Sequence, residues 1–178
     1  MKFFKAVLSA ATGVWLLTAG AFAGDAASAF AAMKTLDGAW EGLVSTDWPQ
    51  SGFDGVHIRV RMHLTSSGHA LTHEMRDATK PETAAYMGDV TVFYLEGGRI
   101  LANHYCDADN RVFLQSKPDS DARMIAFDIT GITGNIKFGY LRDGIFHLGD
   151  PNHHIETWTF IMGNNRAVHV KFDLTRVK

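Results

Sequence analysis

Two side chains that could bind a ligand or take part in catalysis, His104 and Cys106, lie two residues apart in the apolar run VTVFYLEGGRILANHYC. Side chains alternate between the two faces of a strand, so these two point the same way. An imidazole and a thiol on one face could orient a ligand in an apolar pocket, or supply two ligands of a metal ion. The alternative is a hydrogen-bonded core histidine beside a small buried thiol.

Acid–base chemistry has two candidate positions in the sequence, His73-Glu74 and Glu156 with Trp158. Glu156 and Trp158 share one strand face, and burial beside an indole would raise the pKa of a carboxyl group. With His104, either Glu74 or Glu156 could form a general acid and base. The alternative for a glutamate is a place at the rim of the fold, paired with an arginine. The chain contains no nucleophile elbow, P-loop or HExxH motif.

No cofactor is predicted. The spacing fixes no third metal ligand beside His104 and Cys106, and no segment typical of a haem site accompanies an inner-strand histidine. His153 and His154 follow an Asp-Pro-Asn turn and are expected in a loop, since adjacent strand residues face opposite ways and chelate poorly. Three further histidines alternate with core residues and are expected outside: His57, His63 and His169.

The elements that would carry these residues are short strands. Residues 56–64 and 167–177 alternate between apolar and polar side chains, which is typical of half-buried strands. Nine or ten such strands, separated by turn signals, favour an all-β fold, a meander closed into a barrel, with a sandwich as the alternative. The remaining strand-like runs are 69–76, 89–96, 99–106, 111–116, 123–130, 144–148 and 154–162. No linker or repeat interrupts residues 36–178, so one domain is expected there.

One hairpin can be assigned in register from its turn. Gly97-Gly98 suits a type I′ turn, because both central positions of that turn need a positive φ. This register places Thr91 opposite His104 and Phe93 opposite Ala102. One face then includes Thr91, Phe93, Ala102, His104 and Cys106. Both faces are fairly apolar, so register alone does not say which of them is inside.

The first 23 residues resemble a secretory signal peptide. Residues 1–23 contain two lysines, an apolar run and an Ala21-Phe22-Ala23 cleavage site. A membrane anchor is the alternative, but polar and glycine residues interrupt the run. We therefore expect a periplasmic or secreted protein without a membrane span after cleavage. Residues 24–35 are expected to form a tether or a short helix.

Composition limits the partners. Signal cleavage would remove two lysines and no acidic residue, changing the net charge from −2 to −4. An acidic chain offers no electrostatic basis for binding nucleic acid. Cys106 is the only cysteine, so an internal disulfide is excluded and stability must come from the core.

Several sequence blocks resemble a bacterial family of uncharacterised lipocalin-like, or calycin-type, proteins. The blocks are LDGAWEG, TVFYLEGGRILANHYC, IAFDI, IETWTF and FDLTR, and they span most of residues 36–177. The resemblance implies a barrel in which Gly38 and Trp40 lie on the first strand. It also implies that Arg176, on the last strand, packs across the indole of Trp40 as a structural clasp. A guanidinium on an indole contributes about 1–2 kcal/mol when partly desolvated.

The family pattern also implies that the face with His104 and Cys106 is the barrel interior. The chain departs from the pattern in two places. After HYC, DADNRVF at 107–113 replaces the usual G-N-Q-P-R-M, and Tyr140-Leu141-Arg142 stands where a His-x-His is common. A role that those histidines serve in relatives would be lost here. The family has no assigned reaction to carry over.

Three functions fit these features. The first is an exported binding protein that holds a small apolar or amphipathic molecule against Thr91, Phe93, Ala102, His104, Cys106 and Trp158. The second is a cofactor-independent isomerase, cyclase or hydrolase, with His104 and Glu74 or Glu156 as acid and base. The third is a filled barrel with a structural role. Tyr86 and Met87 are expected in a loop over the barrel mouth.

Overall fold

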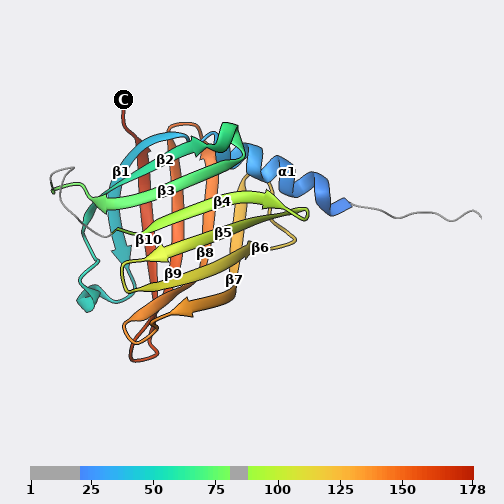
Figure 1. The fold of residues 1–178 in the computed structure, drawn as a ribbon. Coiled ribbons are helices and arrows are strands. Elements are labelled where there is room, and N and C mark those ends of the chain that lie inside the picture. Colours follow the sequence, from blue (N-terminus) through green and yellow to red (C-terminus); the bar gives the residue numbers. More distant parts are fainter. Residues whose placement is uncertain (1–20, 81–87) are drawn as a thin grey trace, which may run out of the picture.

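The ten strands form one closed antiparallel barrel in the computed structural model, which describes residues 21–80 and 88–178. Each strand pairs with the next along the chain, and β1 pairs with β10 to close the barrel (Figure 1). The predicted meander barrel is therefore confirmed, and the sandwich is excluded. The strands are β1 (Gly38–Thr46), β2 (His57–Thr65), β3 (Ala70–Asp77), β4 (Val90–Glu96), β5 (Arg99–Cys106), β6 (Asn110–Ser116), β7 (Met124–Gly134), β8 (Gly139–Asp150), β9 (His153–Met162) and β10 (Ala167–Arg176).

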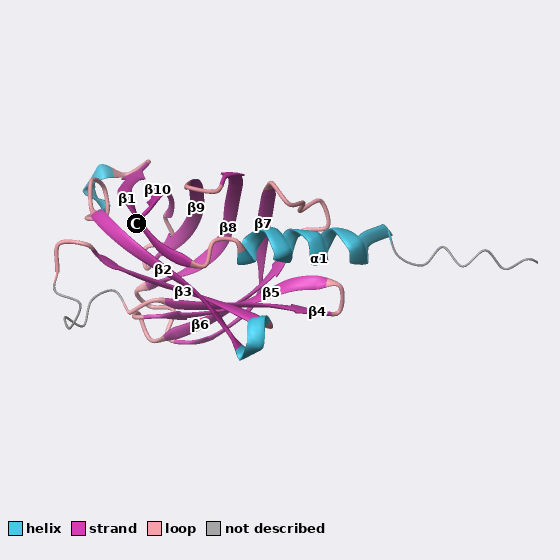
Figure 2. Ribbon diagram, turned by 90° about the horizontal axis from the view of Figure 1, so that it is seen from above, coloured by secondary structure: helices cyan, strands magenta, loops and turns pink. Residues whose placement is uncertain are grey.

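Short helical elements accompany the barrel. Viewed from above, β2–β6 form one layer, β7–β10 and β1 form the facing layer, and α1 lies at one end (Figure 2). The helical elements are α1 (Ala21–Lys34) and the 3-10 turns η1 (Pro49–Ser51) and η2 (Ser66–Gly68). Among residues 21–80 and 88–178, no helix is long and apolar enough to cross a membrane.

The β4–β5 hairpin has the predicted register. Thr91 pairs with His104 and Phe93 with Ala102. Gly97 and Gly98 have φ values of 58° and 73°, as a type I′ turn requires. Thr91, Phe93 and His104 are buried, so the face that carries His104 points into the barrel.

The largest difference from the predicted strands is in β8, which is longer than the run 144–148. Arg142, Asp143 and Gly144 interrupt the apolar alternation within it. The β8–β9 pairing shifts register between Leu141 and Asp143, so a residue is left out of the ladder there. A strand interrupted in this way has no clean period of two for sequence reasoning to detect.

Helix α1 covers one end of the barrel. Its buried side chains, Ala26, Ala29, Phe30 and Met33, follow helical spacing on one face. The last three of them join the barrel core. The helix lies beside the turn between β4 and β5 (Figure 1). It runs from Ala21 to Lys34, so the segment 24–35, expected as a tether or a short helix, is helical up to Lys34. Residues 1–20 of the expected signal peptide, and the expected mouth loop at Tyr86 and Met87, lie outside the described residues.

The first and last strands meet at this covered end. Trp40 pairs with Arg176, whose guanidinium carbon lies 4.1 Å from the centre of the indole ring. The indole is fully buried, and its N–H donates to the carbonyl of Leu36 at 2.7 Å. The guanidinium also donates to three backbone carbonyls, those of Thr35, Asp37 and Pro151. Arg176 therefore connects the end of α1, the start of β1 and the β8–β9 turn.

Aromatic side chains fill the middle of the barrel. Phe93 lies 5.4 Å from Phe127 and 5.5 Å from Phe146, between ring centres. Phe146 in turn lies 5.4 Å from Trp158 in an edge-to-face contact. The aromatic side chains of the described residues therefore fill the middle, and a cavity inside the barrel lies toward the end opposite α1.

Candidate functional site

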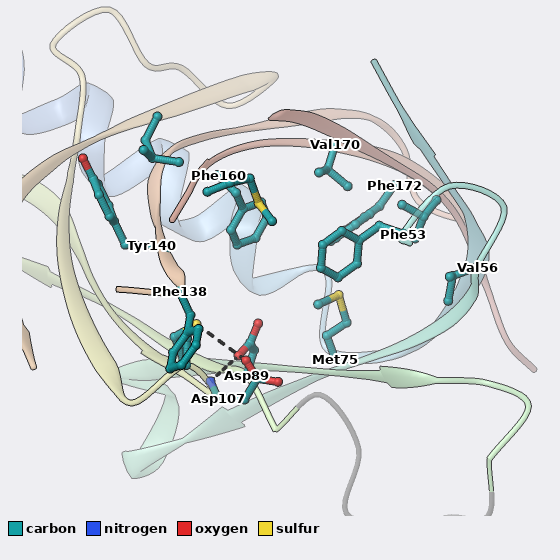
Figure 3. A pocket seen from close by; sticks show the side chains of 16 residues that line it. Phe53, Val56, Met75, Asp89, Asp107, Phe138, Tyr140, Phe160, Val170 and Phe172 are labelled. Atoms are coloured by element: carbon teal, nitrogen blue, oxygen red, sulfur yellow. Dashed lines mark hydrogen bonds between the residues drawn. The ribbon is translucent and has the colours of Figure 1, made fainter. Parts of the chain in front are cut away.

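A mostly apolar cavity of about 120 Å³ opens at the end of the barrel away from α1. Figure 3 shows its lining, with Phe53, Phe160 and Phe172 on one side and Phe138 beside the carboxylates of Asp89 and Asp107 on another. Its apolar walls include Val44, Phe53, Met75, Phe160, Val170 and Phe172. Cys106 also lines it, so one of the predicted ligand-binding residues lies at this cavity.

A second, smaller cavity of about 20 Å³ lies deeper in the barrel. It shares four lining residues with the larger cavity, Met75, Asp89, Phe160 and Phe172. A volume of this size holds roughly one water molecule or one polar ligand atom. The small cavity is also lined by His73, Thr91, His104 and Trp158. The two cavities therefore combine an apolar space with a small inner end that the side chains of His73, Thr91 and His104 border.

His104 is one of the polar side chains at this inner end. Its side chain is buried, with 4% of its surface exposed. Nδ1 lies 2.9 Å from Oγ1 of Thr91, while Nε2 has no hydrogen-bond partner. Burial, with a smaller contribution from His73, lowers the pKa of His104 to about 4, so the ring is neutral near pH 7. A neutral imidazole with one free nitrogen can bind a polar group that enters the cavity.

We expect His104 to make the protein less stable in acid. The unfolded chain protonates this group below its ordinary pKa of 6.5, whereas the folded chain resists protonation until about 4. Stability is therefore lost as the pH falls through this window, by about 3 kcal/mol at 1.36 kcal/mol per pKa unit. Chemical denaturation at several pH values checks this, comparing the wild type with His104→Gln.

The matched control for this experiment is His169→Gln, since His169 is exposed on β10. The control is expected to keep the acid loss of the wild type, and His104→Gln is expected to lack most of it. Equal acid loss in all three proteins would contradict the assignment.

Asp89 and Cys106 lie beside His104. Continuing the β4–β5 register beyond Val90 and Tyr105 places Asp89 opposite Cys106. One ligand atom of each of Asp89, His104 and Cys106 lies within 4.8 Å of those of the other two. Asp89 was not among the predicted site residues, although the predicted register, continued by two residues from Thr91 and His104, places it opposite Cys106.

Both groups are held in a water-poor environment. Burial raises the pKa of the Asp89 carboxyl group, even though this group accepts a hydrogen bond of 2.9 Å from the backbone N–H of Asp107. Burial and the charge of Asp89 raise the pKa of the Cys106 thiol to about 12. Cys106 is therefore a neutral thiol near pH 7 when no cation is close to it.

A buried carboxylate, Glu156, organises the centre of the barrel. It is fully buried and accepts three side-chain hydrogen bonds. His73 Nε2 donates to Oε2 at 3.0 Å, and the Trp158 indole donates to the same oxygen at 2.9 Å. His154 Nε2 donates to Oε1 at 2.9 Å. We call Glu156, His73, His154 and Trp158 the central network.

Glu156 and His73 of the central network shift each other's pKa. Burial alone would raise the pKa of Glu156, but the charge of His73 and hydrogen bonds from His154 and His73 outweigh it and hold this pKa well below its ordinary range. Burial alone would lower the pKa of His73, but the charge and hydrogen bond of Glu156 raise it above 6.5. A carboxylate with both oxygens occupied is poorly suited to remove a proton from a ligand.

The acid–base pairs considered from the sequence do not form around His104. Glu74 is exposed on the outer face of β3, because it follows the inward-facing His73. Glu156 bonds to His73 and His154 instead. His73, placed beside Glu74 in the sequence, is thus the buried member of that pair.

The loop position expected for His153 and His154 is wrong. Both lie in β9, His154 is buried against Glu156, and His153 bonds to Asp173 outside. The Asp-Pro-Asn turn ends one residue earlier than expected, so strand alternation already applies to this pair. The exterior positions expected for His57, His63 and His169 are confirmed.

The other predicted ligand-binding residues divide into two groups. Thr91, His104 and Trp158 line the small cavity. Phe93 and Ala102 are buried in the filled part of the barrel and line neither cavity. The indole of Trp158 packs closely on Gly144 of β8, where an added Cβ atom would clash with it.

Comparison with known proteins supports the fold and goes no further. The chain is similar to Rv2717c from M. tuberculosis, with 12% identity and a TM-score of 0.61 over 86% of this chain and 100% of that one. It is also similar to a protein of unknown function of the DUF3598 family from Nostoc punctiforme, with 12% identity and a TM-score of 0.54 over 82% of this chain. This chain spans 48% of the Nostoc protein, about half its length. No family model and no curated protein matches the sequence.

These structural relatives share a β-barrel with this chain. At 12% identity they inform the fold alone. The more specific resemblance to a lipocalin-like family stays a prediction.

Proposed function

We propose that the protein binds a small, mostly apolar molecule in the open end of its barrel. The observation that carries this proposal is the pair of adjacent cavities, which share four lining residues, with apolar walls and the unpartnered Nε2 of His104 at the inner end. An apolar body would lie against Phe160 and Phe172. One polar atom of the same molecule would reach His104. Apolar pockets with a few converging polar groups are typical of small-molecule sites.

The size of the cavity sets the size of the ligand. The larger cavity measures about 120 Å³. An apolar protein cavity of about 150 Å³ binds benzene. We therefore propose a ligand of about one ring, or a chain of similar volume, carrying one hydroxyl or carbonyl group.

Two other functions have less support. The enzyme predicted from the sequence pairs His104 with Glu74 or Glu156, but Glu74 is exposed and both oxygens of Glu156 are occupied. A purely structural role would not explain why the buried Nε2 of His104 has no hydrogen-bond partner. Binding accounts for this atom directly.

Phenol and benzene serve as probes of the proposed site. We expect phenol to bind more tightly than benzene, because its hydroxyl group can bond to His104 Nε2. Val170→Phe should abolish binding of both, since Val170 lines the cavity and the added ring fills it. Isothermal titration calorimetry checks both expectations.

The matched control is Val92→Phe, the same substitution on the outward-facing side of β4. This variant should bind phenol as the wild type does. Wild-type affinity in Val170→Phe, with the variant folded, would contradict the proposal.

We further propose that the protein is exported and that residues 1–23 direct the export. The intact mass of protein recovered from the periplasm or the medium should lack these residues. Native mass spectrometry of the same gently purified sample would detect a retained ligand and give its mass.

A further inference from the structure

The residues around His104 have a second possible use. Asp89, His104 and Cys106 come from the start of β4 and the end of β5, two antiparallel neighbours. Their ligand atoms lie within 4.8 Å of one another. In a tetrahedral zinc site with bonds of about 2.0–2.3 Å, donor atoms are roughly 3.5 Å apart. Small side-chain rotations therefore bring these three groups to bonding distance of one ion.

The unpartnered nitrogen of His104 is an independent sign of a missing partner. The side chain is 4% exposed, and Thr91 holds Nδ1, so Nε2 is the nitrogen left for an ion. Metal-binding histidines commonly have their second nitrogen fixed by a hydrogen bond. Thr91 supplies that contact, which would fix the direction of Nε2.

We propose that Asp89, His104 and Cys106 bind a divalent zinc-like ion at the inner end of the cavity. Thiolate, imidazole and carboxylate are all ligands of Zn²⁺. The thiolate and the carboxylate together cancel the two positive charges, so the loaded site is neutral, which suits a buried position. On binding, the Cys106 thiol releases its proton to solvent, and its sulfur forms the bond to the ion.

The fourth position of such an ion would face the ligand space. Asp89 and Cys106 line the larger cavity, while Asp89 and His104 line the smaller one. Three protein ligands with one open position are typical of zinc sites that bind water or a substrate. This inference does not depend on apolar ligand binding, because the three donors would hold an ion without an organic ligand.

Cobalt(II) is the probe for this site, because its spectrum reports its ligands. The purified protein, stripped with EDTA and kept reduced, is titrated with cobalt chloride. We expect one equivalent to bind, with a near-ultraviolet cobalt–thiolate band and visible bands of four-coordinate cobalt. Zinc chloride should remove these bands by displacing the cobalt.

Variants assign the ligands. Cys106→Ser should lose the cobalt–thiolate band, and Asp89→Asn and His104→Gln should weaken binding. Thr91→Val should weaken it about 10–100-fold, as expected for a residue that orients a ligand. The matched controls are His169→Gln and Asp128→Asn, both exposed, and they should bind as the wild type does.

A measurement on the wild type keeps the test sound if a variant fails to fold. Saturating zinc should slow the reaction of Cys106 with a thiol reagent, since this is the only cysteine. Absence of a cobalt–thiolate band, or a labelling rate unchanged by zinc, would overturn the proposal. Binding of several ions that survives Cys106→Ser would assign the metal to exterior histidines and would overturn it as well. Phenol binding by the metal-free protein is measured separately, so either proposal can fail alone.

Discussion

Glu156→Leu is expected to lower the free energy of unfolding by about 3–5 kcal/mol, the range found when one partner of a buried ion pair is removed. Glu156 is fully buried and accepts bonds from His73, His154 and Trp158. Leucine fills similar space but accepts no hydrogen bond. Three buried donors would then lose their acceptor, and the protonated form of His73 would lose its counter-charge. Chemical denaturation near neutral pH measures the loss.

Two variants isolate the cause. Glu156→Gln keeps an acceptor oxygen without the charge, so it should be less harmful than Glu156→Leu. Glu74→Leu makes the same change on the exposed side of β3 and should alter stability by no more than about 0.5 kcal/mol. If Glu156→Leu were as stable as the wild type, the central network would not contribute to folding.

Trp40→Ala is expected to cost about 3–5 kcal/mol, as for other fully buried aromatic side chains. The substitution removes the surface on which Arg176 packs and the indole hydrogen bond to Leu36. It also removes an edge-to-face contact with His154, whose ring centre is 4.3 Å away. Thermal and chemical unfolding both measure the loss.

Trp48 provides the matched comparison. Arg166 lies over its ring at 4.3 Å, so this pair repeats the tryptophan–arginine contact, but the indole is only half-buried. Trp48→Ala should therefore cost clearly less than Trp40→Ala. Phenol binding should survive in the folded fraction of Trp40→Ala, because Trp40 lies at the covered end. Lost binding with an unchanged melting temperature would show that Trp40 belongs to the ligand site.

Local patterns were sufficient to predict most of the fold. The period of two identified most strands, and Gly97-Gly98 fixed the β4–β5 register through its turn type. The length of β8 was missed because Asp143 and Gly144 break the alternation at a register shift. That shift depends on pairing with β9, which a local pattern does not contain.

The candidate site was predictable only in part. Strand alternation correctly placed His104 and Cys106 on one face. It could not tell whether His73 or Glu74 faces the barrel interior, because adjacent strand residues point to opposite faces. Asp89 was within reach of the predicted register. The central network was not, because His73 and Glu156 lie on strands far apart in sequence, and the barrel must close before they meet.

Filling of the barrel is a property of volume, which a sequence pattern does not give. Phe93 was expected at the ligand because it faces inward. In the barrel it packs on Phe127 and Phe146, so the described side chains fill the middle, and the two cavities lie toward one end. Inward direction is therefore necessary for a cavity residue and not sufficient.

Because α1 covers one end of the barrel, it affects how a ligand enters and leaves the cavity. Among residues 21–80 and 88–178, the cavity opens past a rim that includes Phe53 and the largely exposed Phe138, and a molecule that uses this opening both enters and leaves across it. Entry and exit then cross the same barrier. A change that only narrows or widens this rim slows or speeds association and dissociation by the same factor, and leaves the dissociation constant where it was.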